Sequence, residues 1–335
     1  MRKRRADDEA RESANVVLGY IAQRVAIGIA TLAIVSVVVF LLTQALPGDI
    51  ARQVLGQNAT PEQLQALREQ LGLERPLIVQ YFSWLGGILT LDLGTALSSG
   101  TPVAELLSVR AANTATVVLV ALVIVIPAAI ALGVFAARRS GRAADHVIST
   151  TMFAILALPE FVVGIVVIAA LAGPALRLFP PTSILDPRYP ALSQPALLVL
   201  PVITMILIAL PHLTESVKAL VRDELGSEHV LWSRLGGVRE QRLMLRGVLP
   251  NVASPTAQVV VATINFLVGG TVAVEVVFGF PGIGSALVAA VANRDIVVVQ
   301  AIAMGIALIL VVAFLVADLV GFITTPRLRT AGASR

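Results

Sequence analysis

Long runs of apolar residues, separated by short polar segments, dominate this chain. The hydrocarbon core of a bilayer is roughly 30 Å thick, so a helix of about 20 apolar residues crosses it. Two of the runs have a polar interruption, since residues 147–176 contain Glu160 and residues 196–214 contain His212. Together with four uninterrupted runs, they predict six transmembrane helices in an all-α integral membrane protein. The uninterrupted runs are residues 25–47, 111–137, 252–274 and 296–317.

The composition excludes a water-soluble globular protein. Of the 335 residues, 57% are hydrophobic and 14% are charged, and the mean hydropathy is +0.87. Soluble domains carry about 25% charged residues. The chain has no cysteine, which excludes disulfides and thiolate chemistry. Its three histidines, His146, His212 and His229, are far apart in sequence, so we expect no metal site built from them.

The distribution of basic residues predicts the orientation in the membrane. Most of the 25 Lys and Arg residues lie before the first run, after the second and fourth runs, and in the tail. Because basic residues favour cytoplasmic connections, both termini are expected in the cytoplasm. The first run is expected to be a retained signal-anchor. The predicted organisation is a cytoplasmic N-terminus (1–24), a first transmembrane helix (25–46), an external capping segment (47–109), a core membrane domain (110–325) and a cytoplasmic tail (326–335). In the core domain we expect helices at about 111–136, 147–171, 196–215, 252–274 and 298–322, with a cytoplasmic loop at 216–250.

The external segment contains a helix start. Thr60 is suited to the N-cap, Pro61 to the first helical position and Gln63 to a capping box. Apolar positions then recur at helical spacing, which predicts an ordered cap on the outer face, or a packed lid without a ligand of its own. The apolar positions are Leu64, Leu67 and Leu71, and Gly72 is the predicted end of the helix.

The loop at residues 216–250 is long enough to have a structure and a function of its own. We expect two short amphipathic helices, separated by Gly236 and Gly237, with the second helix ended by Pro250. Such a basic amphipathic element either lies on anionic lipid headgroups or inserts into a groove of a cytosolic partner protein. The spacing alone leaves both readings open.

Polar residues within the apolar runs are candidates for function, because they are costly at membrane depth. Glu160 either lines a translocation path or is neutral and bonded to a backbone carbonyl freed by Pro159. Asn265 either lines the path or joins helices. A local hydrogen-bonded pair between His212 and Glu215 is favoured over a proton relay. We expect Asp318 to pair with a neighbouring helix or the inner interface.

Several separated motifs occur in a characteristic order along the chain, and they identify a family. Over nearly its whole length, the sequence resembles the first permease subunit of bacterial dipeptide and oligopeptide ABC importers. The motifs are FLLTQALPGD (40–49), QLGLERPLIVQY (70–81), LDLG (91–94), VEVVFGFPGIG (274–284), Arg294-Asp295, Gln300, Asp318 and PRLR (326–329).

The resemblance implies an architecture and a set of partners. It implies a type I ABC importer permease of the MetI-like kind, multi-pass in the bacterial cytoplasmic (inner) membrane. The implied partners are a homologous second permease, two cytosolic ATPases, an external binding protein, a peptide substrate and membrane lipid, without nucleic acid. The chain has no G-x-x-x-x-G-K-[ST] motif, so it is expected to have no nucleotide site and no enzymatic activity. ATP and Mg²⁺ would be bound by the partners, and no cofactor by this chain.

The resemblance also implies roles for particular residues. In the inner loop, Gly237 matches the glycine of the coupling loop by which permeases of this family dock into a cleft of the ATPase subunit, and Leu249-Pro250 matches the end of that loop. The family usually has basic residues where this chain has Leu231 and Gly236. The implied ATPase-coupling residues are Glu228, Leu231, Arg234, Leu235, Gly236, Gly237, Arg242, Leu249 and Pro250. The implied outer gate comprises Glu275, Phe278, Pro281, Gly282 and Gly284, which alternatively form only a tight turn.

We therefore expect a permease subunit that imports dipeptides or oligopeptides with energy from partner ATPases. One alternative is an ABC importer permease for nickel or another small solute. A second alternative, from another class, is an ion-driven secondary transporter in which Glu160 or His212 titrates. A membrane-embedded enzyme ranks last, because no nucleophile, carboxylate pair or metal set is clustered in the sequence.

Overall fold

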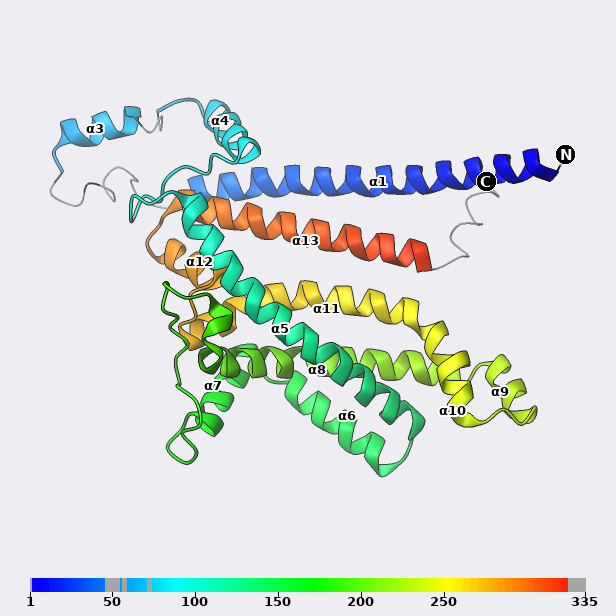
Figure 1. Ribbon diagram of the computed structural model, residues 1–335. Helices are drawn as coiled ribbons and strands as arrows, with labels where there is room; N and C mark the ends of the chain where they lie inside the picture. The colour runs from blue at the N-terminus through cyan, green and yellow to red at the C-terminus, as the bar shows by residue number, and fades with distance from the viewer. Residues whose placement is uncertain (1, 46–54, 56–58, 71–73, 325–335) are drawn as a thin grey trace. The chain divides into compact units, whose positions relative to one another are not determined.

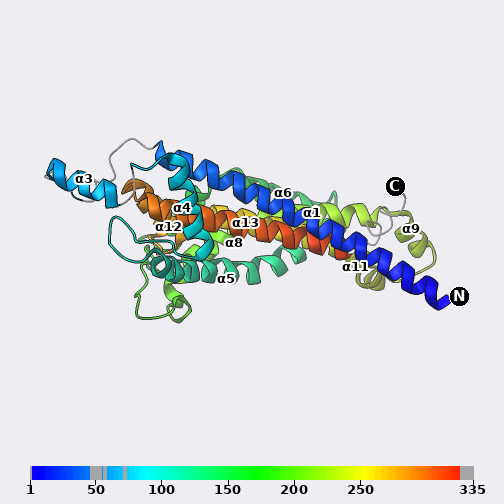
Figure 2. The same cartoon turned by 90° about the horizontal axis from the view of Figure 1, so that it is seen from above.

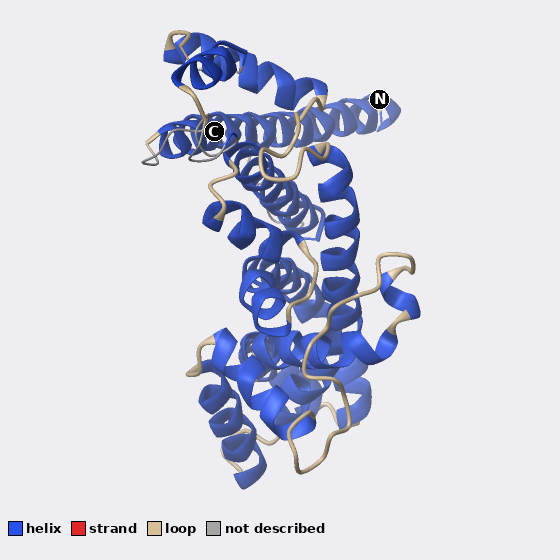
Figure 3. Cartoon of the chain, turned by 90° about the vertical axis from the view of Figure 1, so that its left-hand side faces the viewer, coloured by secondary structure: helices blue, strands red, loops and turns tan. Residues whose placement is uncertain are grey.

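The computed structural model describes residues 2–45, 55, 59–70 and 74–324. In these residues the secondary structure is helical, without strands apart from an isolated bridge between Thr95 and Pro102 (Figure 3). The chain forms two compact units. Unit 1 comprises residues 1–28, 116–280 and 312–335, and unit 2 comprises residues 29–115 and 281–311. Three long helices contribute to both units: α1 (Arg2–Gln44), α5 (Val103–Arg138) and α13 (Ile296–Thr324) (Figure 1).

Five helices are long and apolar enough to cross a membrane, and a bent pair makes a sixth candidate. The predicted all-α membrane fold is therefore confirmed. The five are segments of α1, α5 and α13, the helix α8 (Pro195–Leu225), and a continuous run, Glu240–Phe278, that contains α10 (Glu240–Leu243) and α11 (Leu249–Phe278).

The bent pair replaces the single helix that the sequence predicted over 147–171. α6 (Ala143–Leu156) and α7 (Glu160–Leu171) meet at an angle of 107°. Pro159 explains the break, because proline lacks the backbone N–H and disfavours helical geometry in the residue before it. Pro159 itself has an extended backbone, with φ −58° and ψ 145°, and directly precedes the first residue of α7.

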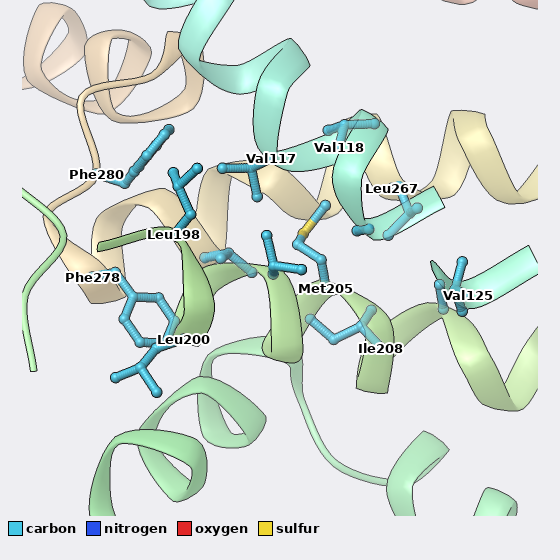
Figure 4. Packing of buried hydrophobic residues seen from close by; sticks show 14 of the residues in the cluster. Val117, Val118, Val125, Leu198, Leu200, Met205, Ile208, Leu267, Phe278 and Phe280 are labelled. Atoms are coloured by element: carbon cyan, nitrogen blue, oxygen red, sulfur yellow. The ribbon is translucent and has the colours of Figure 1, made fainter. Parts of the chain in front are cut away.

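The core of unit 1 is built around α8, which packs against α6, α7 and α11. Met205 and Leu200 of α8, Leu267 of α11 and Phe278 are all almost fully buried there (Figure 4). Between helices in lipid, close packing rather than the hydrophobic effect stabilises association. Gly133 of α5 illustrates how close the approach is, because a Cβ at this position would stand 2.8 Å from the carbonyl oxygen of Thr214.

A second cluster in unit 1 fixes the segment that was predicted as the inner loop. α8 continues to Leu225, so residues 216–225 belong to a long helix and not to a separate short one. α9 (Glu228–Leu235) follows, and then α10. The buried residues that join these helices include Val217, Val221, Val230, Leu243, Met244 and Val248.

Pro250 does not end a helix, so that prediction was wrong. A π-helical turn, Met244–Val248, connects α10 to α11, and Pro250 lies in the first turn of α11. The proline is tolerated here because the helix changes from π to α geometry at this point, where the regular i→i−4 hydrogen bonding is already interrupted. The chain therefore passes from α10 into α11 without a break.

Unit 2 contains α3 (Pro61–Gln70), α4 (Leu77–Thr90) and α12 (Ile283–Ala292). The predicted capping box is confirmed, because Thr60 N–H donates to Gln63 Oε1 at 3.0 Å and Gln63 N–H donates to Thr60 Oγ1 at 3.3 Å. Leu64 is buried. The side chain of Leu67, residues Leu71 and Gly72, residues 46–49 of the first motif and the tail 326–335 lie outside the described part of the chain.

α4 lies beside the unit 2 part of α1 (Figure 2). Tyr81 shares a 2.8 Å hydrogen bond with Ser36, and Phe40 stacks edge-on to Tyr81 with 5.4 Å between ring centroids. Trp84 lies 5.7 Å from the Phe40 ring. Gln300 Nε2 donates to Thr43 Oγ1 at 2.7 Å, which pairs two buried polar side chains of α13 and α1.

Candidate functional site

The first candidate site is an apolar surface on α9, the turn after it and the π-helical turn Met244–Val248. Val230 is fully buried against α8, so α9 is held in place, while its neighbours point outward. Leu231, Trp232 and Leu235 are 56%, 70% and 69% exposed. Apolar surface grouped on one short element is typical of an interaction site. We call this the coupling surface, after the role that the family resemblance implies for this segment; it comprises Leu231, Trp232, Leu235, Val238 and Leu245.

The turn between α9 and α10 is set by glycine. Gly237 has φ +76°, a left-handed conformation that favours glycine, and no atom lies within 4 Å of the Cβ it lacks. Arg234 bridges the turn to Glu240 with an Nη2–Oε1 distance of 2.9 Å. Gly236 follows the last residue of α9 and donates its N–H to Trp232 O at 2.9 Å. The Gly236-Gly237 break predicted from the sequence is confirmed.

The remaining predicted coupling residues lie around this turn in different settings. Glu228 is in the first turn of α9, and Arg242 is exposed on α10. Leu249 is partly buried against the second apolar cluster of unit 1, the one that contains Val230, and Pro250 is exposed at the start of α11. Trp232 and Leu245 were not among the predicted site residues. The sequence feature that could have identified them is a large apolar side chain within a segment rich in charged residues.

A charged cluster joins α6 to α8 near the start of the inner segment. Lys218 forms an ion pair with Asp145, and its Nζ donates to Ser149 Oγ at 2.6 Å. Ser149 Oγ donates to Glu215 Oε1 at 2.7 Å. The Lys218 and Asp145 side chains are only 12% and 8% exposed. The cluster ties the helix that leads into the coupling surface to its neighbour.

This cluster replaces the predicted pair of His212 and Glu215. Glu215 binds Ser149 and lies 3.6 Å from Lys218, while His212 is exposed. The expectation of a local His212–Glu215 pair was wrong, because the partners of Glu215 come from another helix and from its own helix one turn further on. The predicted pairing of Asp318 is confirmed, with Arg24 of α1 at 3.1 Å from its carboxylate.

Glu160 lies at the break between α6 and α7. Its carboxylate faces α11, since a Cβ on Gly270 would stand 3.1 Å from Glu160 Oε1. Within the described residues, no hydrogen bond or ion pair engages this carboxylate. Asn265 of α11 has both amide atoms buried without a hydrogen-bond partner in the described chain. The two residues lie on helices that pack together, but no hydrogen bond joins them.

The residues of the predicted outer gate fall into two local structures. In unit 1, Glu275 and Phe278 are 3% and 0% exposed, so they belong to the core. In unit 2, Pro281 O accepts a 2.9 Å hydrogen bond from Asn113 Nδ2. Gly282 caps α12, its N–H donating to Ser285 Oγ at 3.1 Å, and Gly284 is buried in the first turn of that helix.

Among the described residues, no group of three His, Cys, Asp or Glu side chains could hold a metal ion. The long apolar helices and the bent pair of α6 and α7 are those of a multi-pass membrane protein. Residues 129–330 match the family described as binding-protein-dependent transport system inner membrane component, and residues 17–133 match its N-terminal companion family. The chain belongs to this family, and it is a multi-pass inner-membrane protein.

Curated relatives are similar to the chain over most of its length. The probable peptide ABC transporter permease protein y4tP of Sinorhizobium fredii is 29% identical over 312 residues, which cover 92% of this chain and 99% of the relative. The oligopeptide transport system permease protein AppB of Bacillus subtilis is 30% identical, with 92% and 98% covered. The metal-staphylopine import system permease protein CntB of Staphylococcus aureus is 29% identical, also with 92% and 98% covered.

Proposed function

We propose that this chain is one of two permease subunits that form the translocation path of an ABC importer for dipeptides or oligopeptides. The peptide reading rests on what its relatives are named for, including y4tP and AppB. The observation within the structure that carries the proposal is the exposed coupling surface held on α8 by the buried Val230. Its partners would be a second permease, two ATPases and an external binding protein.

In this proposal, the coupling surface docks into a groove of an ATPase subunit. An apolar helix face in a groove is a common mode of recognition. The chain has no phosphate-binding glycine motif, so ATP and Mg²⁺ would be bound by the partners, and this chain would need no cofactor and catalyse no reaction. Movement of the ATPases would displace α9, and the Lys218–Asp145 ion pair would transmit that displacement from α8 to α6.

In this proposal the coupling surface and both termini lie in the cytoplasm, because most basic residues lie in the corresponding segments and basic residues favour cytoplasmic connections. The binding protein would deliver substrate to the opposite side, where the turn from Glu275 to Gly284 shapes the gate. Glu160 and Asn265 are proposed to line the path. In the proposed spans, a carboxylate or an amide without a hydrogen-bond partner is costly unless water or a substrate supplies one. Polar residues of this kind in membrane proteins often mark the transport pathway.

The test is reconstitution of the complete importer in vesicles. The expected result is uptake of a labelled dipeptide or oligopeptide that requires ATP and the loaded binding protein. Uptake of a nickel or metal-chelate substrate in place of peptides would overturn the substrate assignment while leaving the permease assignment intact. Uptake by this chain alone, driven by an ion gradient, would overturn the proposal and support a secondary transporter.

The docking step has its own test. A variant with Trp232→Ala and Leu235→Ala should no longer retain the ATPase subunits in a pull-down. A matched control with Leu176→Ala and Leu178→Ala removes two apolar side chains that are 54% and 58% exposed elsewhere, and should retain them. Equal retention in both variants would contradict the assignment of the coupling surface.

A further inference from the structure

α4 exposes apolar side chains although it is too short to span a membrane. Its 14 residues include none that is buried. A helix of this length extends about 21 Å, less than the roughly 30 Å of a hydrocarbon core. Ile78, Phe82 and Leu89 are 64%, 61% and 76% exposed. With spacings of four and seven residues, these three side chains lie on one face of the helix.

Another face of α4 is fixed to α1. Tyr81 and Trp84 pack around Phe40, and Gln44 Nε2 donates to Gln80 Oε1 at 3.1 Å. Gln80 Nε2 in turn donates to the carbonyl oxygen of Arg75 at 2.8 Å. The helix is therefore held along α1, so the exposed apolar face has a set direction. A face of this kind in water would be unfavourable, since each large apolar side chain is worth about 1.5–3 kcal/mol on burial.

A cavity of about 360 Å³ lies beside α4 within unit 2, and its lining is partly polar. Arg75 and Asp92 supply one positive and one negative charge. Within the described residues, the Arg75 guanidinium has no hydrogen-bond partner, and Asp92 Oδ1 accepts only the N–H of Gly94, at 3.3 Å. The volume is in the range of small-ligand sites. The remaining lining includes Phe40, Trp84, Gln44 and Gln300.

We propose that α4 and this cavity form a binding site for an aminophospholipid. The exposed face of α4 lies among acyl chains at the membrane interface, and the cavity holds the headgroup. Arg75 binds the phosphodiester, which a guanidinium engages through two parallel hydrogen bonds. Asp92 accepts from the ammonium group. Tyr81 and Trp84 occupy the interfacial level that these residue types favour in membrane proteins. α4 is then an interfacial helix and not part of a span.

The charges and the apolar face together select this occupant. A zwitterionic headgroup matches one Arg and one Asp, and its attached acyl chains match the adjacent apolar face. A second permease subunit would also cover apolar surface, but it would leave the charged cavity unexplained. The inference concerns the lipid environment and does not depend on which solute the protein transports.

The first experiment uses spin labels, and the absence of cysteine makes each label unique in this chain. Ile78→Cys and Leu89→Cys are labelled with a nitroxide before assembly with the partner subunits in phosphatidylethanolamine-containing vesicles. Ile34→Cys in α1, at a side chain 65% exposed, is the bilayer reference, and Glu62→Cys in α3 is the aqueous reference. We expect both α4 labels to collide with oxygen, as at position 34, rather than with a water-soluble nickel chelate.

Two results of that experiment would overturn the proposal. Collision with the nickel chelate, as at position 62, would place the face in water. Shielding from both reagents with an immobilised spectrum would mean that another subunit covers it.

The second experiment measures the lipid retained by the purified complex. Arg75→Gln should lower the phosphatidylethanolamine retained per complex by about one molecule, while Arg177→Gln, an exposed arginine in another loop, should leave it unchanged. Unchanged retention in Arg75→Gln would overturn the headgroup assignment. Displacement of the retained lipid by a transported peptide would assign the cavity to the peptide instead, and would also overturn it.

Discussion

The carboxylate of Glu160 lies against the bare backbone of Gly270, with Oε1 3.1 Å and the carboxyl carbon 3.3 Å from the position that a Cβ would take. The contact brings the first residue of α7 onto α11 without an intervening side chain. The neighbouring Gly269 has open space at its Cβ position. Two adjacent glycines therefore differ sharply in what a methyl group would meet.

Gly270→Ala should destabilise the protein and displace Glu160. The added methyl group is tighter against the carboxylate than ordinary van der Waals contact, and overpacking of this kind costs about 1–3 kcal/mol. Gly269→Ala should be neutral or slightly stabilising, because alanine has a higher helix propensity than glycine. Thermal unfolding of the two variants in detergent gives the comparison. Equal melting temperatures would contradict the packing described here.

Glu160→Gln should change which peptides are carried. If Glu160 lines the path as proposed, loss of its charge should lower uptake of cationic peptides by about tenfold, equivalent to ~1.4 kcal/mol of lost interaction. Uptake of neutral peptides should change little. The measurement compares lysine-containing and neutral peptides, each with a free or acetylated amino terminus, in reconstituted vesicles. A uniform change across all four substrates would argue for a structural role instead.

Lys218→Met should be among the most destabilising substitutions in the chain. It leaves Asp145 without its ion-pair partner at a site where that side chain is 8% exposed. Breaking a buried ion pair by removing one partner costs about 3–5 kcal/mol. Arg222→Gln, an exposed position one turn further along α8, serves as the control and should have little effect. Melting temperatures measured on both purified variants test the difference.

Gly237→Ala should cost about 1–2 kcal/mol, because φ at this position is +76° and a side chain disfavours that conformation. No steric clash adds to the cost, since the Cβ would have open space. Gly237→Asn should cost less, because asparagine visits the left-handed region more readily. Coupled ATPase activity of the assembled importer, measured for both variants, is expected to follow the same order. Identical losses would indicate that the glycine is needed for contact with a partner rather than for its backbone.

The sequence predicted the spans well because apolar length depends only on local composition. It did not predict the division at Pro159, although the proline was visible, because prolines are often accommodated within a membrane helix. It also placed the end of a helix at Pro250. Whether a proline ends a helix or lies in its first turn depends on the backbone before it, and here the π-helical turn Met244–Val248 precedes Pro250 and leads into α11.

Ion pairs between residues on different helices could not be predicted from the sequence. Lys218 and Asp145 are separated by most of α6, all of α7 and most of α8, and periodicity carries no information on which helices face each other. Asp318 was expected to find a partner on another helix, but Arg24 could not be named. The turn at Gly236-Gly237 was predicted from the sequence, while the exposure of Trp232 and Leu245 became visible only from the packing of Val230 and Leu243.

The π-helical turn Met244–Val248 has a consequence for how the protein can change over evolutionary time. Such a turn holds one more residue than the α-helical turn it replaces. Deletion of a single codon in this stretch would convert the turn to a regular α-helical one, and α10 and α11 would keep about the same relative rotation, because the extra residue is held within a single turn. The π-helical turn is therefore a place where the length of the chain can change by one residue while the faces of α10 and α11 stay in register.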